Sequence, residues 1–165
     1  MTRDLIQTFS YRISQASRSQ LVVILYDMAL EYLKEAKELA VSESDKREDV
    51  HMAYSQALRN CGRAVDLLIK GLDFQYDISG QLFQIYLYVK KELVKCVARE
   101  DAEKLNHLEG ILKKLRGSFY EVSKTDTSQP LMKNTQQIFS GLTYSSSGSS
   151  NEIAGGVTTN RGITV

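Results

Sequence analysis

The sequence predicts an all-α protein: an antiparallel up-down four-helix bundle with an N-terminal strap and a mostly disordered C-terminal tail. Four segments between residues 17 and 124 repeat apolar residues at spacings of three and four, the period of an amphipathic helix. No stretch alternates at period two for long enough to predict a strand. Because the connections are short, consecutive helices must run antiparallel, and a four-helix bundle is the simplest packing that buries all four stripes.

The change in composition after Lys124 and the cap at Ser17 divide the chain into three parts. We expect a strap over residues 1–16, a bundle over 17–124, and a tail over 125–165 that is rich in Ser, Thr, Gly and Asn and contains Pro130. The 21 Lys and Arg residues nearly balance the 20 Asp and Glu residues, so no global field favours nucleic acid or an anionic membrane. Without a signal peptide or a run of ~20 apolar residues, the chain is expected to be cytoplasmic, with no membrane insertion.

The first two helices of the bundle have recognisable starts. Ser17 and Gln20 form a capping-box pattern, so the first helix should begin after Ser17 and run to about Val41. The second should run from about Glu48 to Leu72, where Gly62 costs about 1 kcal/mol relative to Ala. We expect Gly62 to serve a close approach of a neighbouring helix.

The third and fourth helices each follow an Asp. We expect Asp77 to cap a helix that runs to about Ala98, and Asp101 to cap a helix that runs to about Lys124. The two cysteines, Cys61 and Cys96, fall on apolar stripes and are expected to be reduced core residues.

The first and third helices carry more apolar surface than a bundle requires. Between Leu21 and Leu33 only Asp27 and Glu31 are polar. This surplus indicates either a broad core or a groove that the protein's own terminus or a partner helix fills. The candidate groove residues are Leu21, Leu25, Met28, Tyr32, Leu82, Ile85, Tyr86 and Val89. The N-terminal segment, with Phe9, Tyr11 and Ile13, is then either a removable lid or a terminus with incidental apolar residues.

Motifs for catalysis are sparse. Glu48 and His51 form a single E-x-x-H, whereas a carboxylate-bridged di-iron bundle needs two, and His107 lies four residues after Glu103. The sequence contains no glycine-rich phosphate loop and no Cys-x-x-Cys pair. We therefore expect a binding protein and no enzyme, with no catalytic residue, cofactor site or metal site.

Several short patterns resemble the FliS family of flagellar export chaperones. Ala16, Ser17, Leu21 and the run Leu25, Tyr26, Asp27 in "ASRSQLVVILYDMALEYLKEA" match the family's first helix. The resemblance continues in "LLIKGLD", "LFQIYLYV" and "ILKKLRGSF" and covers about residues 9–124. Arg18 stands where the family has Pro, the usual Gly-Gly before the third helix is absent, and Phe119 replaces a Trp; the tail after Lys124 lies outside the pattern.

The resemblance implies a cytosolic chaperone that binds the C-terminal segment of flagellin, prevents premature polymerisation, and delivers it to a component of the flagellar type III export gate. It further implies that the groove holds the flagellin segment and that Phe9, Tyr11 and Ile13 cover the groove when flagellin is absent. Tyr26 either touches flagellin or packs in the core, with the core favoured. The alternative is a four-helix adaptor or chaperone for another export client or regulator.

The tail contains a short apolar segment. Its apolar residues are Leu131, Met132, Ile138, Phe139, Leu142 and Tyr144. Either the tail is inert, or this segment docks on exposed apolar surface of the body and competes with the client.

Overall fold

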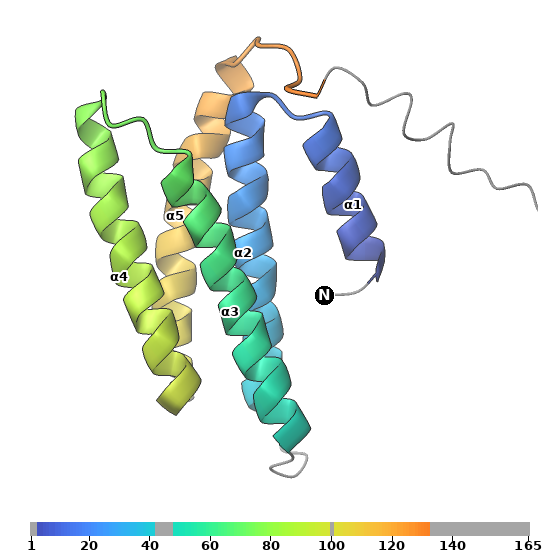
Figure 1. The fold of residues 1–165 in the computed structure, drawn as a ribbon, viewed down its shortest axis with the longest axis vertical. Helices are drawn as coiled ribbons and strands as arrows, with labels where there is room; N and C mark the ends of the chain where they lie inside the picture. Colours follow the sequence, from blue (N-terminus) through green and yellow to red (C-terminus); the bar gives the residue numbers. More distant parts are fainter. Residues whose placement is uncertain (1–2, 42–47, 100, 133–165) are drawn as a thin grey trace, which may run out of the picture. The chain divides into compact units, whose positions relative to one another are not determined.

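The structure is a computed structural model that describes residues 3–41, 48–99 and 101–132. All secondary structure in these ranges is helical, which confirms the predicted all-α class for the described residues. Figure 1 shows the arrangement. The helices are α1 (Arg3–Ser14), α2 (Arg18–Val41), α3 (Glu48–Lys70), α4 (Asp77–Arg99) and α5 (Ala102–Thr125).

The N-terminal strap is a helix, α1, which the sequence reading did not identify as one. Leu5, Phe9 and Ile13 are spaced four apart and face α2, where all three pack in one apolar cluster. On the remaining surface of α1 the hydroxyls of Thr8 and Ser10 donate to carbonyls four residues earlier, at 2.9 and 2.8 Å. Such back-bonding weakens a helix slightly, so the stability of α1 depends on its apolar contacts.

The ends of α2 and α5 follow the predicted caps. The Ser17 amide donates to Gln20 Oε1 at 3.0 Å and the Gln20 amide donates to Ser17 Oγ at 3.4 Å, which completes the capping box. Asp101 Oδ1 accepts from the Lys104 amide at 2.9 Å and caps α5. The start of α4 differs from the prediction, because Asp77 is the first residue of this helix and not the cap before it.

The turn before α4 is organised by Asp73. Its carbonyl accepts from Ser79 Oγ at 2.6 Å and from the Tyr76 amide at 3.2 Å. These bonds join the turn to the first residues of α4.

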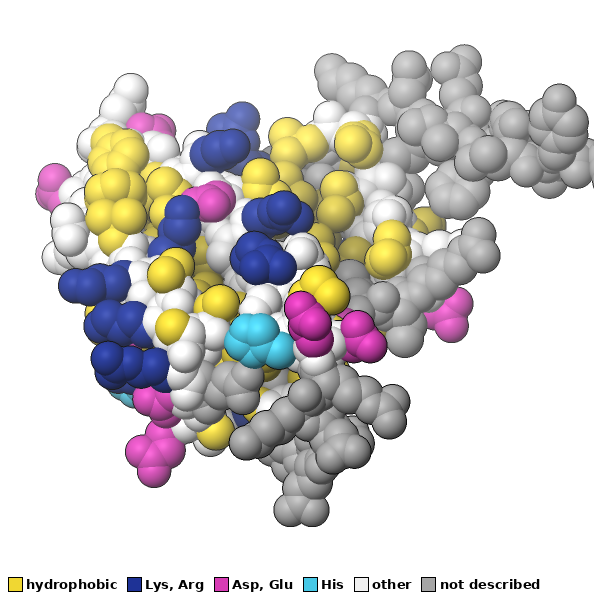
Figure 2. Space-filling view, turned by 60° about the horizontal axis from the view of Figure 1, so that its bottom comes forward, with side chains coloured by type: hydrophobic (Ala, Val, Ile, Leu, Met, Phe, Trp, Pro, Cys, Tyr) yellow, Lys and Arg dark blue, Asp and Glu magenta, His cyan; other side chains and the backbone are white. Residues whose placement is uncertain are grey.

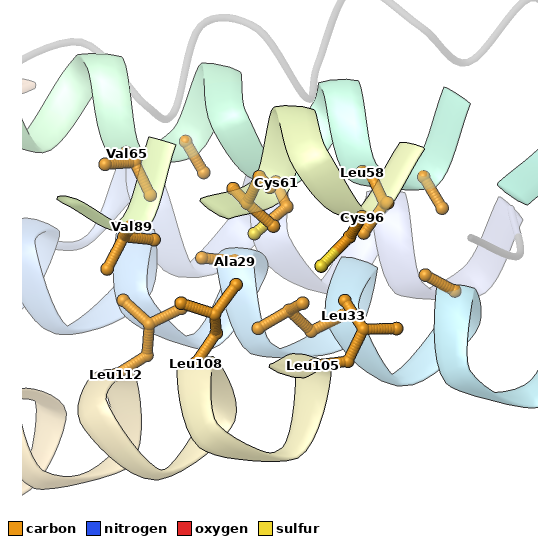
Figure 3. Close-up of a cluster of buried hydrophobic side chains, with 14 of the residues drawn as sticks. Ala29, Leu33, Leu58, Cys61, Val65, Val89, Cys96, Leu105, Leu108 and Leu112 are labelled. Carbon is orange, nitrogen blue, oxygen red and sulfur yellow. The ribbon is translucent and has the colours of Figure 1, made fainter. Parts of the chain in front are cut away.

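Four helices enclose the main core. α2 contacts α3 and α5, and α4 contacts the same two helices. Figure 3 shows Leu105, Leu108 and Leu112 of α5 directed toward α2. The residues of this core that are less than 2 % exposed include Tyr26, Leu33, Leu58, Val65, Tyr86, Val89, Leu105, Leu108 and Leu112.

Both cysteines lie in this core. Cys61 of α3 and Cys96 of α4 are buried free thiols, as predicted (Figure 3). Burial raises the pKa of the Cys61 thiol to about 12, so this side chain stays protonated and unreactive at neutral pH.

Gly62 does not serve the close helix approach that we expected. A Cβ at this position of α3 would meet no atom within 4 Å. The helix therefore carries a glycine that its own packing does not require.

A pair of buried tyrosines forms a polar link inside the core. The hydroxyls of Tyr26 on α2 and Tyr86 on α4 lie 2.5 Å apart, and the Tyr26 ring lies 5.6 Å from that of Phe119 on α5. Burial, with the Tyr86 hydrogen bond second, raises the pKa of Tyr26 well above its ordinary value. Each hydroxyl is thus the hydrogen-bond partner of the other in a part of the core from which water is excluded.

We expect Tyr86→Phe to lower the free energy of unfolding by about 1–3 kcal/mol, because it leaves the buried Tyr26 hydroxyl without a partner. The double variant Tyr26→Phe, Tyr86→Phe should recover part of this loss, since no hydroxyl then remains unpaired. Urea denaturation of the wild type, both single variants and the double variant measures the coupling. Strictly additive losses would contradict a mutual hydrogen bond.

Candidate functional site

The main candidate site is an apolar face of α2 that α1 covers. Phe9 of α1, Ala16 of the connection and Ile24 of α2 are at most 5 % exposed and pack together. We call this group, with its half-buried neighbours, the strap cluster. Its half-buried members are Leu5, Ile13, Leu21 and Met28. The strap cluster is separate from the main core, so α2 contributes to two apolar clusters.

One carboxylate joins α1 to α2 and α5. Asp27 Oδ2 accepts from Arg12 Nη2 of α1 at 2.5 Å, and Asp27 Oδ1 accepts from Arg116 Nε of α5 at 2.9 Å. The Asp27 side chain is 17 % exposed, so both bonds are only partly screened by water. Asp27 is thus a shared anchor for the strap and the last helix.

Two cavities remain beside this anchor. One of about 620 Å³ lies between α1, α2 and α5 and includes Tyr11, Val23 and Tyr120 in its lining. The other, of about 470 Å³, is lined by residues that include Leu5, Leu30 and Lys113. α1 therefore covers the surface between α2 and α5 without filling it.

The connection between α1 and α2 is held by the residues that follow α5. Asp126 Oδ2 accepts from Ser17 Oγ at 2.9 Å, from the Ser19 amide at 3.3 Å and from the Ser19 hydroxyl. The Leu131 amide donates to the Ala16 carbonyl at 3.0 Å. We call these contacts the hinge clamp, because they fix the residues about which α1 would turn.

Hydrogen bonds lower the pKa of Asp126 below its ordinary value. The largest contribution comes from Ser128, followed by Ser19 and Ser17. All three stabilise the carboxylate rather than the acid, so ionisation of Asp126 strengthens the hinge clamp.

A second apolar groove lies where the turn between α3 and α4 meets the last turns of α5. It has a volume of about 410 Å³, and its lining includes Leu72, Leu82, Leu115 and Phe119. Ile78 and Val122, which continue the apolar stripes of α4 and α5, are 60 % and 58 % exposed at this groove. Their stripes continue beyond the enclosed core, which leaves apolar side chains at the end of the bundle. Phe74 and Tyr76 of the turn are exposed as well.

The predicted groove residues do not form one surface. Leu21 and Met28 belong to the strap cluster, whereas Leu25, Tyr32 and Ile85 pack half-buried against the main core. The remaining three, Leu82, Tyr86 and Val89, are buried in that core.

The three predicted strap residues also differ from one another. Phe9 is buried and Ile13 half-buried in the strap cluster, while Tyr11 is 59 % exposed and lines the larger cavity. In the tail, Leu131 and Met132 are about half exposed. The other apolar tail residues, Ile138, Phe139, Leu142 and Tyr144, lie outside the described residues.

Sequence reasoning missed the polar residues that hold α1 in place. Arg12, Arg116 and Asp126 make contacts over long sequence separations, and no local pattern marks them. Ile24 was missed because the surrounding run is apolar at nearly every position. The spacing of Leu5, Phe9 and Ile13 was a usable signal for α1.

Within the described ranges, no group of three or more His, Cys, Asp or Glu side chains is arranged to hold a metal ion. The same residues include no helix that is long and apolar enough to span a membrane.

A helical domain with one apolar face covered by its own N-terminal helix and an apolar groove at its end has the architecture of a helical protein-binding module. The family model described as "Flagellar protein FliS" matches residues 2–126, and the chain therefore belongs to the FliS family of flagellar proteins. No curated protein matches the chain.

We expect Asp27→Ala to loosen α1 while the four-helix core stays folded, because both arginines lose their shared partner. Partly exposed ion pairs of this kind contribute about 1 kcal/mol or less each, so the melting temperature should fall by only a few degrees. Hydrogen exchange of the α1 amides should accelerate markedly, whereas the amides of α3 should keep their protection. Unchanged exchange in α1 would contradict the role of Asp27 as an anchor.

The hinge clamp should also weaken in acid. The folded pKa of Asp126 is depressed, so its contribution is complete above the unfolded value of about 3.9 and is lost as pH falls through the lower folded value. NMR shifts of the Ser17, Ser19 and Leu131 amides, followed from pH 6 downward, should change together below about pH 4. Asp126→Asn should show the low-pH shifts of these amides already at pH 6.

Proposed function

We propose that this protein is a flagellar type III export chaperone that binds the C-terminal segment of flagellin on the face of α2 that α1 covers. The observation that carries this proposal is the strap cluster: an apolar surface on α2, closed by a short helix of the same chain. Such a surface suits an amphipathic helix, whose apolar residues recur every three to four positions.

In the proposed mechanism α1 and the client compete for the same face. α1 is bound by one small apolar cluster and by Asp27, and it leaves cavities on both sides of that anchor. A longer client helix would fill more of the surface between α2 and α5 than α1 does. Because α1 must be displaced first, the apparent affinity for the client equals the intrinsic affinity multiplied by the fraction of molecules in which the face is open. This lower affinity keeps binding reversible at the export gate.

We further propose that α2, α3, α4 and α5 form an antiparallel up-down bundle that serves as the rigid support of this face. The contacts of α2 and α4 with both α3 and α5 support that arrangement. In this proposal the chaperone works in the cytoplasm, keeps flagellin from polymerising and delivers it to an export-gate component. The groove at the end of the bundle, near Phe119 and Val122, is a second apolar surface for the same client.

The alternative is an adaptor or chaperone for another export client or a regulator. It uses the same covered face, and it differs only in the identity of the helix that replaces α1. Competition between flagellin and a candidate client distinguishes the two.

The test is calorimetric titration with a peptide that covers the C-terminal helical segment of flagellin from the same organism, with circular dichroism of the mixture. Folding on binding predicts more helicity than the sum of the parts. Leu21→Glu or Met28→Glu should weaken binding at least tenfold, since each places a charge in the strap cluster. Leu25→Glu and Ile85→Glu should also weaken it, with circular dichroism to verify that these half-buried positions still allow folding.

Phe9→Ala should have the opposite effect. It removes the buried anchor of α1, so the covered face opens more often and the flagellin peptide should bind several-fold more tightly. Ile6→Ala is the matched control, because Ile6 lies on α1 but is 53 % exposed, and its affinity should equal that of the wild type. Weaker binding in the Phe9 variant would mean that α1 contacts the client instead of competing with it.

A further inference from the structure

A separate hollow lies between α3 and α4, outside the strap cluster and the groove at the end of the bundle. It has a volume of about 240 Å³. Its apolar lining consists of the buried Leu58 and Leu93, the half-buried Val97, and Val94, which is 70 % exposed. The volume is that of one or two large side chains.

The hollow lies beside Gly62. A Cβ there would meet no atom within 4 Å, so neither packing nor backbone geometry demands a glycine. A glycine inside a helix nevertheless costs about 1 kcal/mol relative to Ala. The absent side chain leaves a recess between two helices that is open to an incoming group.

Cationic side chains border this recess. Arg59 and Arg63 of α3 and Lys90 of α4 line it, together with Asp66, which pairs with Lys90. The guanidinium groups donate to neutral partners, Arg59 to Gln56 Oε1 at 3.3 Å and Arg63 to Asn60 Oδ1 at 3.1 Å. Among the described residues neither arginine has a carboxylate partner. Figure 2 shows, on one face of the molecule, Lys and Arg side chains interspersed with hydrophobic ones.

We propose that this recess is a docking site for an acidic amphipathic helix of another protein. One large apolar side chain of that helix would enter the hollow at Gly62 and contact Val94 and Val97. Carboxylates one turn away would pair with Arg59 and Arg63, whose planar forks match carboxylate oxygens. The charge and shape of the recess therefore favour a helix that has one large apolar side chain with Asp or Glu residues one turn away.

This partner differs from a polyanion such as RNA. A phosphate chain pairs with arginines but has no side chain to fill an apolar hollow, so its binding would not depend on the space at Gly62. The site is also independent of the proposed flagellin face, because none of the residues that line the recess belongs to the strap cluster.

The experiment uses the full-length protein and a synthetic peptide of Leu, Ala and Glu that forms an amphipathic helix and contains no Lys or Arg. Gly62→Leu fills the recess and improves helix propensity, so the variant should fold at least as well as the wild type. We expect peptide binding, seen as NMR shifts confined to α3 and α4, and a loss of affinity of at least tenfold in Gly62→Leu. Arg59→Glu with Arg63→Glu should abolish binding, whereas Lys114→Glu, an exposed charge reversal on α5, should not.

Three results would overturn the proposal. The first is no shift at any residue of α3 or α4, and the second is equal affinity of the peptide for wild type and Gly62→Leu. The third is full competition between the peptide and a single-stranded RNA oligonucleotide that binds the wild type and Gly62→Leu equally. That result would mean that binding to this surface is purely electrostatic. The flagellin peptide should bind Gly62→Leu as it binds the wild type, so failure here is distinguishable from failure of the proposed function.

Discussion

The position of the strap depends on the two ion pairs of the Asp27 carboxylate. This carboxylate accepts from Arg12 of α1 and Arg116 of α5, while the preceding residue, Tyr26, is fully buried and bonded to Tyr86 of α4. Two adjacent residues thus connect α2 to a core helix, the last helix and the strap. The backbone of α2 fixes the direction of both side chains, so the position of α1 follows from the packing of the core.

The surplus apolar surface of α2 is explained by two clusters on one helix. Tyr26, Ala29 and Leu33 face the main core, whereas Leu21, Ile24 and Met28 face α1. Burying a side chain such as Phe9 contributes about 1.5–3 kcal/mol, and each partly exposed ion pair contributes about 1 kcal/mol or less. These contributions hold α1 on the face, and their modest size is in line with the proposed displacement of α1 by a client.

The sequence predicted α2, α3, α4 and α5 well but not α1, because apolar periodicity and caps are local and no cap was recognised before α1. Ser17, Gln20 and Asp101 predicted the first residues of α2 and α5 to within one position. The assignment of single apolar residues to groove or core was harder. Leu82, Tyr86 and Val89 recur at helical spacing just as Leu21 and Met28 do, so their pattern does not distinguish the two sets. Only the packing of α1 separates these sets. Arg12, Arg116 and Asp126 were beyond local reasoning, since their partners lie elsewhere in the chain.

The hinge clamp can form only late in the synthesis of the chain, after the strap cluster is complete. Ser17 and Asp126 are 109 positions apart, and Asp27 and Arg116 are 89 apart. During synthesis the N-terminal segments emerge first, so α1 and the strap cluster leave the ribosome well before Arg116 and the residues of the hinge clamp. Until α5 and the residues after it are made, only the strap cluster and the Arg12–Asp27 ion pair can hold α1 on α2. A newly made chain therefore passes through a state in which the strap is held by α2 alone, and the length of that state is set by the time needed to complete α5 and the residues after it.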